Sequence, residues 1–356
     1  MQSINSRASV VHFGKPGYEQ LNRYLKKAKH SKIFILVDSN TYNFCFAHFM
    51  SKIEGDHDTE VIEVEPGEIH KNIETCTGIW NVLSELGADR KSLIINLGGG
   101  VITDMGGFIA CTFKRGINYV NVPTTLLSMV DASVGGKTGV DLGNLKNMVG
   151  VISESEMVLI DTEYLETLPV EQMCSGFAEM LKHGLIKDQS YWKSLSDLSK
   201  VDSSALDQMI YDSVLIKNDI VKEDPTEQNI RKFLNFGHTL GHAIESFYLT
   251  HPDLPTLLHG EAIAIGMILE SFISKELLAL TDQELIEISE VILATFSKVS
   301  IAPSHRRSIK DLLIFDKKNE NGTIFFVLLK SIGEAVYNQE VPEAIIDASF
   351  EYYRNL

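Results

Sequence analysis

The pattern of hydrophobic residues changes near residue 165, and this change constrains the fold more than any other feature. Before it, short apolar runs alternate with helical stretches such as 72–86. Strands that alternate with helices are typical of a parallel sheet covered by helices. The first 165 or so residues therefore predict an α/β domain. The apolar runs expected to form strands are 32–37, 61–64, 92–97 and 119–122.

Beyond Leu168-Pro169 the chain has mainly helical periodicity. Only the run 323–329 has the composition of a strand. A chain of 356 residues is too long for one ordinary core. We therefore expect two domains, 1–165 and 166–356. The helices expected in the second domain are 171–185, 203–221, 236–247, 261–278 and 282–296.

Composition excludes several classes of protein. The formal net charge of −16 argues against a nucleic-acid or anionic-membrane partner. No apolar run reaches the length of a membrane span, and the N-terminus has no apolar segment typical of a secretory signal. The four cysteines are not spaced as pairs, which indicates a reducing compartment without structural disulfides. We therefore expect a cytoplasmic protein.

A glycine-rich segment, Gly98-Gly99-Gly100, joins a predicted strand to a predicted helix. Glycines allow close approach of a ligand to the backbone, and a helix N-terminus suits a pyrophosphate. The segment is not the GxGxxG fingerprint, and a tight strand–helix turn would use the same residues. Asp38 closes an earlier strand, where an acid can bind a ribose hydroxyl or cap a helix. Thr124 and Thr125 follow another strand and would also serve as caps.

A second glycine-rich segment, Gly135-Gly136-Lys137-Thr138, resembles part of a nucleotide P-loop. The P-loop needs glycine at position 131, where Asp131 stands, so an ATPase is excluded. A lysine flanked by glycine still suits a phosphate or a carboxylate. In an acidic protein the other cations could converge on an anion, or each could be a solvated surface charge. These cations are Arg115, Lys146, Lys182, Lys217, Arg231, Lys317 and Lys318.

Three histidines are candidate metal ligands. His238 and His242 are spaced i and i+4, so they share one face of a helix. The Glu of HExxH is missing, so the pattern is not that of a zincin protease. His259 opens another predicted helix, and Glu179 lies three residues before Lys182. A His/His/Glu set with open positions would form a catalytic metal site, although helix packing or capping could use the same histidines.

Taken together, these motifs resemble the dehydroquinate synthase family of sugar-phosphate cyclases, in the same order over about residues 35–330. The resemblance implies a Rossmann-like N-terminal domain and an all-α C-terminal domain. Thr103 departs from the more usual glycine, and 143–147 looks longer than the usual Gly-Lys-Asn. The matching segments are 98–101 with Asp104, 114–116, 123–127, 130–139, 146–147, 167–169, 176–182, 234–245, 259–261 and 316–318.

The resemblance implies two cofactors, NAD and one divalent metal ion, Zn²⁺ or Co²⁺. It assigns the metal to Glu179, His238 and His259, and places His242 near the substrate phosphate instead. The residues implied to contact NAD are Asp38, Glu68, Lys71, Gly99, Gly100, Val101, Asp104, Thr124, Thr125, Lys137, Lys146, Thr167 and Leu168.

The implied activity is that of a phosphorus–oxygen lyase of the shikimate pathway of aromatic amino acid biosynthesis. It converts 3-deoxy-D-arabino-heptulosonate 7-phosphate to 3-dehydroquinate and phosphate. Arg231 would pair with the substrate carboxylate, and Arg115 would come from the second subunit of a homodimer. The implied catalytic residues are Asp131, Lys137, Lys182, Asn235 and His242. The implied substrate-binding residues are Arg115, Lys146, Asn147, Lys217, Arg231, Lys317 and Lys318.

Three other functions are compatible with parts of this pattern. A sister cyclase would act on sedoheptulose 7-phosphate or glucose 6-phosphate, which lack the carboxylate that Arg231 and Asn235 are expected to recognise. A metal-dependent NAD alcohol or glycerol dehydrogenase would share the fold, but the segment at 135–139 and the cations argue against it. A non-catalytic binding protein is disfavoured because no expected ligand or cation is missing.

We predict that Lys137→Ala and His242→Ala impair turnover more than folding, because both residues are expected to act on the substrate. Steady-state rates and melting temperatures of the two variants test this. A large fall in melting temperature, with full activity in the fraction that stays folded, would contradict it.

Overall fold

The structure, a computed structural model, describes residues 1–143, 145–196, 203–313 and 323–356. Its contacts divide the chain into two compact units, Met1–Pro169 and Val170–Leu356. This division falls shortly after the boundary that the sequence predicts at residue 165. The helix-rich second unit begins where the alternating pattern ends.

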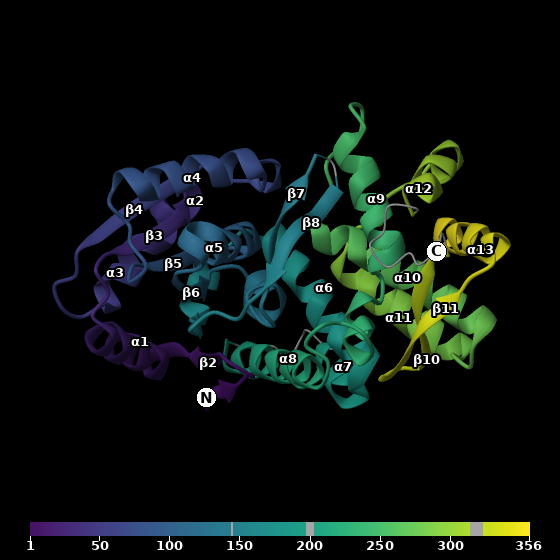
Figure 1. The fold of residues 1–356 in the computed structure, drawn as a ribbon. Helices are drawn as coiled ribbons and strands as arrows, with labels where there is room; N and C mark the ends of the chain where they lie inside the picture. The colour runs from purple at the N-terminus through teal and green to yellow at the C-terminus, as the bar shows by residue number, and fades with distance from the viewer. Residues whose placement is uncertain (144, 197–202, 314–322) are drawn as a thin grey trace. The chain divides into compact units, whose positions relative to one another are not determined.

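The first unit contains a seven-stranded sheet in which only the β1–β2 pair is antiparallel. Figure 1 shows its strands in purple to teal. The four strands expected from the sequence are all present, as β3, β4, β5 and β6, which confirms the Rossmann-like α/β prediction. In spatial order the strands are β1 (Ile4–Asn5), β2 (Val10–Phe13), β9 (Met157–Ile160), β6 (Asn118–Pro123), β5 (Leu93–Gly98), β3 (Ile33–Asp38) and β4 (Thr59–Val64).

The strands of this sheet are apolar without alternation because helices cover them. Residues 33–37 of β3 are all buried, as expected for a parallel sheet covered on both faces. Phe34 and Leu36 share one core cluster with α4 (Ile73–Glu85) and α5 (Gly100–Thr112). The helix α1 (Gly14–Ala28) packs against β2 and β9. The short helices α2 (Ser39–Thr41) and α3 (Ala47–Lys52) follow β3.

The second glycine-rich segment leads into a hairpin that the sequence did not predict. Gly135 and Gly136 have φ angles of 99° and 69°, a left-handed conformation that glycine adopts without strain. They are followed by β7 (Lys137–Leu142), which pairs with β8 (Leu145–Ile152). Lys137 is therefore the first residue of a strand.

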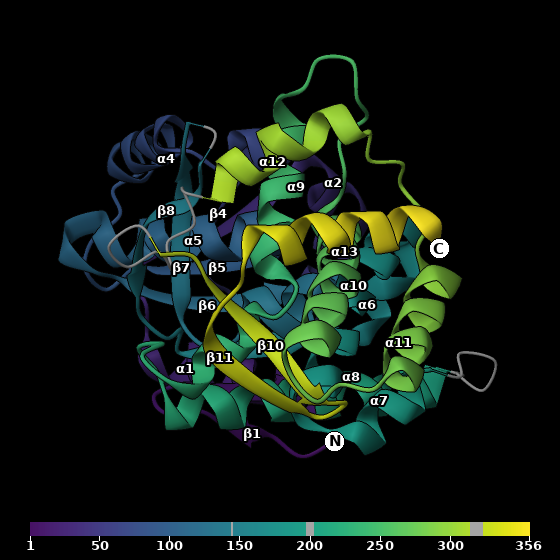
Figure 2. The same ribbon diagram turned by 90° about the vertical axis from the view of Figure 1, so that its right-hand side faces the viewer.

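The second unit is built around α10 (His259–Leu277), a helix that is buried on almost every side. It packs against α6 (Val170–Lys187), α9 (His238–Thr250), α11 (Asp282–Thr295) and α13 (Glu343–Asn355), as Figures 1 and 2 show. The other helices are α7 (Gln189–Leu195), α8 (Ser203–Glu223) and α12 (Arg306–Leu312). All five helices that the sequence predicts are present.

One small sheet interrupts this helical unit. The expected strand is present as β10 (Phe325–Ser331), and it pairs with a second strand, β11 (Glu334–Glu340), which the sequence analysis missed. β11 shows little hydrophobic signal because only one of its residues, Ala335, is buried. Among the described residues, no helix has both the length and the apolar character that a membrane span needs. The four cysteines are free thiols.

Glycines allow α9 and α10 to approach each other closely. A methyl group on Gly266 would place its carbon 1.9 Å from the carbonyl oxygen of Gly237. Gly237 has a φ of 77° and leaves room for Met267. The backbones of the two helices are therefore almost in contact at this crossing.

We predict that Gly266→Ala destabilises the protein, because the added methyl group must displace the backbone of Gly237. Overpacking of this kind costs about 1–3 kcal/mol, so the urea midpoint should fall clearly. Gly78→Ala is the matched control, because it lies in α4 with open space around it. That change should be neutral or stabilise by up to about 1 kcal/mol. Equal midpoints for Gly266→Ala and wild type would contradict the prediction.

Candidate active site

The helix α6 brings a carboxylate and an ammonium together in the interior of the second unit. Glu179 and Lys182 lie three residues apart, and both side chains are almost completely buried. The Nζ of Lys182 contacts Oε2 of Glu179. Burying a carboxylate costs free energy unless cations or hydrogen bonds compensate, and Lys182 compensates at one oxygen.

The other oxygen of Glu179 faces two imidazoles. Nε2 of His238 lies 3.5 Å from Oε1, and Nε2 of His259 lies 3.6 Å from it. Nδ1 of His238 is 3.0 Å from the carbonyl oxygen of Phe236, and Nδ1 of His259 is 3.2 Å from Oε2 of Glu245. These oxygens only accept hydrogen bonds, so both Nδ1 atoms donate. In the neutral rings, each Nε2 therefore directs a lone pair towards Glu179.

This arrangement fits a bound divalent cation. Ligand atoms on a tetrahedral ion at about 2.1 Å would lie about 3.4 Å apart, close to the 3.5 and 3.6 Å that separate the two imidazole nitrogens from Oε1 of Glu179. Lone pairs directed at one another repel, and a cation among them removes the repulsion. The anchored Nδ1 atoms are the outer-shell contacts that normally orient histidine ligands. Two nitrogens and a carboxylate oxygen suit Zn²⁺ or Co²⁺ and leave a position open for a substrate.

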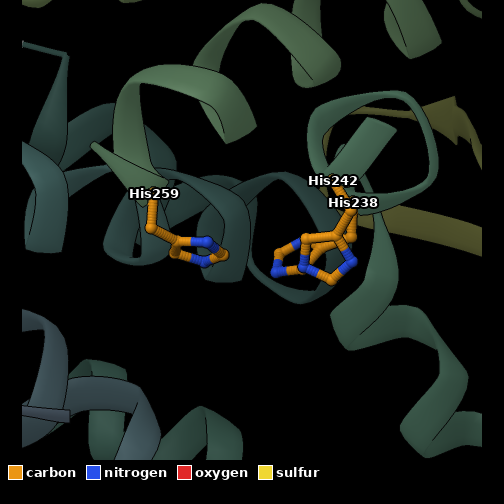
Figure 3. Close-up of side chains that lie close together, drawn as sticks. All are labelled: His238, His242 and His259. Atoms are coloured by element: carbon orange, nitrogen blue, oxygen red, sulfur yellow. The ribbon is translucent and has the colours of Figure 1, made fainter. Parts of the chain in front are cut away.

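His242 lies beside this group. Candidate ligand atoms of His238, His242 and His259 all lie within 4.8 Å of one another. Figure 3 shows the His238 and His242 rings side by side, with His259 pointing towards them. The ring centroid of His242 lies 5.0 Å from that of His238 and 5.8 Å from that of His259. Distance alone thus allows His242 as a further ligand, and its assignment to the substrate phosphate stays a prediction.

A loop before the 3-10 helix η7 (Ile230–Asn235) fixes the position of Arg231. Asp224 accepts backbone N–H bonds from Gln228, Asn229 and Arg231 at 3.0, 2.6 and 3.1 Å. Nη1 of Arg231 donates to the carbonyl oxygen of Pro225 at 2.7 Å. Burial acts to raise the pKa of Asp224, but these N–H bonds and the charge of Arg231 outweigh it and lower the pKa from 3.8.

The same loop contains a residue that the sequence analysis missed. Oε1 of Glu227 accepts a hydrogen bond from Nδ2 of Asn235 at 2.8 Å, which orients the amide of this predicted catalytic residue. The backbone of Glu227 has a φ of 61°, unusual for a residue other than glycine. No sequence signal marks it, because a glutamate among polar residues is typical of any surface loop.

The predicted cations differ in their burial. Lys182, Lys217 and Arg231 are buried in the second unit, so the alternative interpretation as solvated surface charges does not apply to them. Arg115 and Lys137 are exposed. Arg115 also has a φ of 69°. Its neighbours in the chain, Lys114 and Gly116, have positive φ angles as well. Lys317 and Lys318 lie outside the described residues.

In the first unit, Lys71 is the centre of an ionic network. Its Nζ lies 2.7 Å from Asp104, 2.7 Å from the side-chain oxygen of Asn147 and 3.8 Å from Glu68. Lys146 lies 3.2 Å from Glu68. Burial acts to lower the pKa of Lys71, but Asp104 and Glu68 outweigh it and raise the pKa. The structure thus joins five residues predicted to bind NAD or substrate, and Lys146 takes part in spite of its unusual sequence context.

The other predicted NAD residues follow neighbouring strands. β3, β5 and β6 are adjacent and parallel, so the residues after them share one sheet edge, where nucleotides bind in such folds. Asp38 caps α2 through Thr41 at 2.8 Å, and Gly99 is the N-cap of α5. Thr124 donates its backbone N–H to Gly98, and Thr125 caps the backbone N–H of Ser128. The capping alternatives are therefore present for Asp38 and Thr125, and NAD contact stays a prediction.

Four more residues of this unit are predicted site residues. Val101 lies in the first turn of α5, and Asp131 lies half-buried in the short π-helix η4 (Ser128–Ala132). Thr167 is the last residue of the 3-10 helix η5 (Thr162–Thr167), and Leu168 follows it. Their roles stay predictions.

Comparison with known proteins identifies the family. The N-terminal model of 3-dehydroquinate synthase matches residues 61–175, and the C-terminal model matches residues 176–319. A 3-dehydroquinate synthase from Parabacteroides distasonis is 41% identical over 337 residues, which cover 94% of this chain and 95% of that protein. The chain belongs to the 3-dehydroquinate synthase family.

Solved structures agree with this family and its fold. The 2-epi-5-epi-valiolone synthase ValA from Streptomyces hygroscopicus subsp. jinggangensis, which holds NAD⁺ and Zn²⁺, is 25% identical, with a TM-score of 0.85. The match covers 100% of this chain and 99% of that one. An NADH-dependent butanol dehydrogenase A from Thermotoga maritima shares the fold alone, at 12% identity and a TM-score of 0.69. It is covered over 98% of its length, and this chain over 99%.

We predict a pH-dependent contribution of Asp224 to stability. Its folded-state pKa lies below the unfolded value of about 3.9, so its stabilisation is present above that value and is lost as the pH falls through the folded-state pKa. Asp224→Asn should lower the free energy of unfolding by about 1–3 kcal/mol at neutral pH, because buried N–H groups lose an acceptor. Urea unfolding at several pH values should show this difference shrinking below about pH 4. A difference that is the same at acidic and neutral pH would contradict it.

Proposed function

We propose that this chain converts 3-deoxy-D-arabino-heptulosonate 7-phosphate to 3-dehydroquinate and phosphate, with NAD and one divalent metal ion as cofactors. Matches of the family models to both halves of the chain support this activity. The observation that carries it is the convergence of two imidazole nitrogens on one buried oxygen of Glu179. A protein that only bound the sugar would not need such a ligand set.

When bound, NAD supplies reversible hydride transfer and the metal polarises a substrate oxygen. The side chains of the second unit have the charge that this substrate requires. The guanidinium of Arg231, held by Pro225, would bind the carboxylate with two parallel hydrogen bonds. Lys182 and Lys217 would contribute positive charge for the phosphate, and the amide of Asn235 would donate to a substrate oxygen. His242 would hold or transfer a proton at the phosphate.

The first unit would bind the dinucleotide along the edge where β3, β5 and β6 end. The N-terminus of α5, after Gly99, would hold the pyrophosphate, and Asp38 would bind a ribose hydroxyl. The Lys71 network would keep Asp104 and Glu68 in place for these contacts. Asp131 and Lys137 are proposed to contact the substrate.

Location and assembly follow from the family and not from the described contacts. We place the enzyme in the cytoplasm, in line with its four free cysteine thiols, and propose a homodimer. Arg115, exposed on a strained turn, is the residue proposed to act in the site of the partner subunit. We also propose, from the net charge of −16, that the protein has no nucleic-acid partner.

The first test is release of phosphate from 3-deoxy-D-arabino-heptulosonate 7-phosphate by purified protein with NAD, with sedoheptulose 7-phosphate in parallel. Release should require the carboxylated sugar, stop on chelation, return with Zn²⁺ or Co²⁺, and occur without NADH accumulation. Release from sedoheptulose 7-phosphate alone would identify a sister cyclase. Net NADH formation from a simple alcohol would identify a dehydrogenase.

Arg231→Gln tests the recognition of the carboxylate. We expect kcat/KM to fall about 100-fold, which corresponds to about 2.7 kcal/mol, because a charged hydrogen-bonded pair is lost. Arg307→Gln is the control, since Arg307 is exposed in the same unit. Equal kcat/KM values for the two variants would remove Arg231 from the proposal.

A further inference from the structure

A buried glutamate that the proposed chemistry does not use contacts α9, the helix that begins with His238. Glu270 belongs to α10, the helix that His259 opens, and its side chain has no exposure to solvent. Its Oε2 accepts the backbone N–H of Gly237 at 2.6 Å, and its Oε1 accepts that of Leu240 at 3.1 Å. Both amides belong to the N-terminus of α9.

These two bonds replace a cap that the local sequence does not provide. Helix N-termini need acceptors for their first N–H groups, usually from a side chain at the N-cap or an acid in the first turn. The N-cap of α9 is Gly237, which has no side chain, and the first turn, 238–241, contains no acid. Glu270 therefore caps α9 from another helix.

The position of the capped amides matters because His238 lies between them. His238 is the first residue of α9, directly after Gly237, and its Nδ1 bonds to the carbonyl oxygen of Phe236. The direction of its Nε2 thus depends on how the chain from Phe236 to Leu240 is held. Glu270 holds this segment at Gly237 and at Leu240.

The same carboxylate links the two histidines of the metal site. Glu270 follows His259 by eleven residues, about three helical turns plus 20°, so both side chains lie on the face of α10 that packs against α9. Between them on this face, Gly266 lets α10 approach Gly237 closely. A shift of the N-terminus of α9 relative to α10 would change the distances from His238 to His259 and Glu179.

We propose that Glu270 is a positioning residue for the metal centre, which fixes His238 relative to His259 by capping α9 from α10. This inference rests on the proposed metal site of Glu179, His238 and His259.

The test compares metal binding by Glu270→Gln and Glu284→Gln. Glutamine keeps the volume of the side chain but offers one acceptor and one donor, so one N–H of α9 loses its partner. Glu284 is a matched control, because its carboxylate also accepts two backbone N–H bonds, from Thr281 at 2.9 Å and Ile332 at 3.1 Å, but at α11. Both variants should lose some thermal stability.

Metal-free full-length protein is titrated with Co²⁺, and Zn²⁺ affinity is measured by competition. We expect Glu270→Gln to weaken metal binding about 10- to 100-fold, as loss of outer-shell contacts typically does, and to shift the visible absorption of bound Co²⁺. Glu284→Gln should keep the wild-type affinity and spectrum. A purely structural cap would lower the stability of both variants and leave the Co²⁺ spectrum unchanged.

Unchanged metal affinity and Co²⁺ spectrum in folded Glu270→Gln overturn the inference. If that variant does not fold, Glu270→Asp takes its place, because aspartate keeps the charge but is too short to reach both amides, and an unchanged affinity again overturns it. Wild-type protein that binds no metal, or whose binding survives His238→Ala, contradicts the proposed metal site itself. The two failures are therefore distinguishable without any activity assay.

Discussion

The organisation of the second unit depends on one electrostatic arrangement, in which two imidazole nitrogens face a buried carboxylate oxygen. Glu179 has no exposure to solvent, and Lys182 contacts only one side of it. His238 and His259 approach the other side with Nδ1 atoms that are already hydrogen-bonded. In water, without the surrounding protein, these four side chains would move apart. The packing of α6, α9 and α10 holds the group together, and a divalent cation would balance it.

Glycines at the crossing of α9 and α10 let the two helices bring His238 and His259 close together. Gly237 and Gly266 let α9 and α10 approach until their backbones nearly touch, which side chains at these positions would prevent. Two carboxylates orient the histidines. Glu245 accepts a hydrogen bond from His259, and Glu270 caps the helix that begins with His238. The site is thus supported by buried acids, and each acid has a backbone or imidazole partner that offsets its desolvation.

The first unit uses ionic contacts differently. Lys71 is buried among Asp104, Glu68 and Asn147, and the neighbouring carboxylates keep its ammonium charged. The network connects β8 to the start of α4 and to α5, segments far apart in the sequence. Such a network rigidifies the carboxyl edge of the sheet, where the strands β3, β5 and β6 end and a dinucleotide is expected.

The sequence by itself determined four strands of the first unit, five helices and one strand of the second, the change of architecture near residue 165 and the residue types of the site. Hydrophobic periodicity and motif spacing depend on neighbours along the chain, so β3, β5, α9 and α10 could be predicted from it. The hairpin of β7 and β8, the partner strand β11 and the contacts of Glu227 and Glu270 could not. Glu270 lies 33 residues from Gly237 along the chain, and a glutamate in a helix is ordinary in sequence. Only the tertiary structure decided which acid meets which amide, because a helix pattern indicates which face is buried but not which atoms of another helix pack against it.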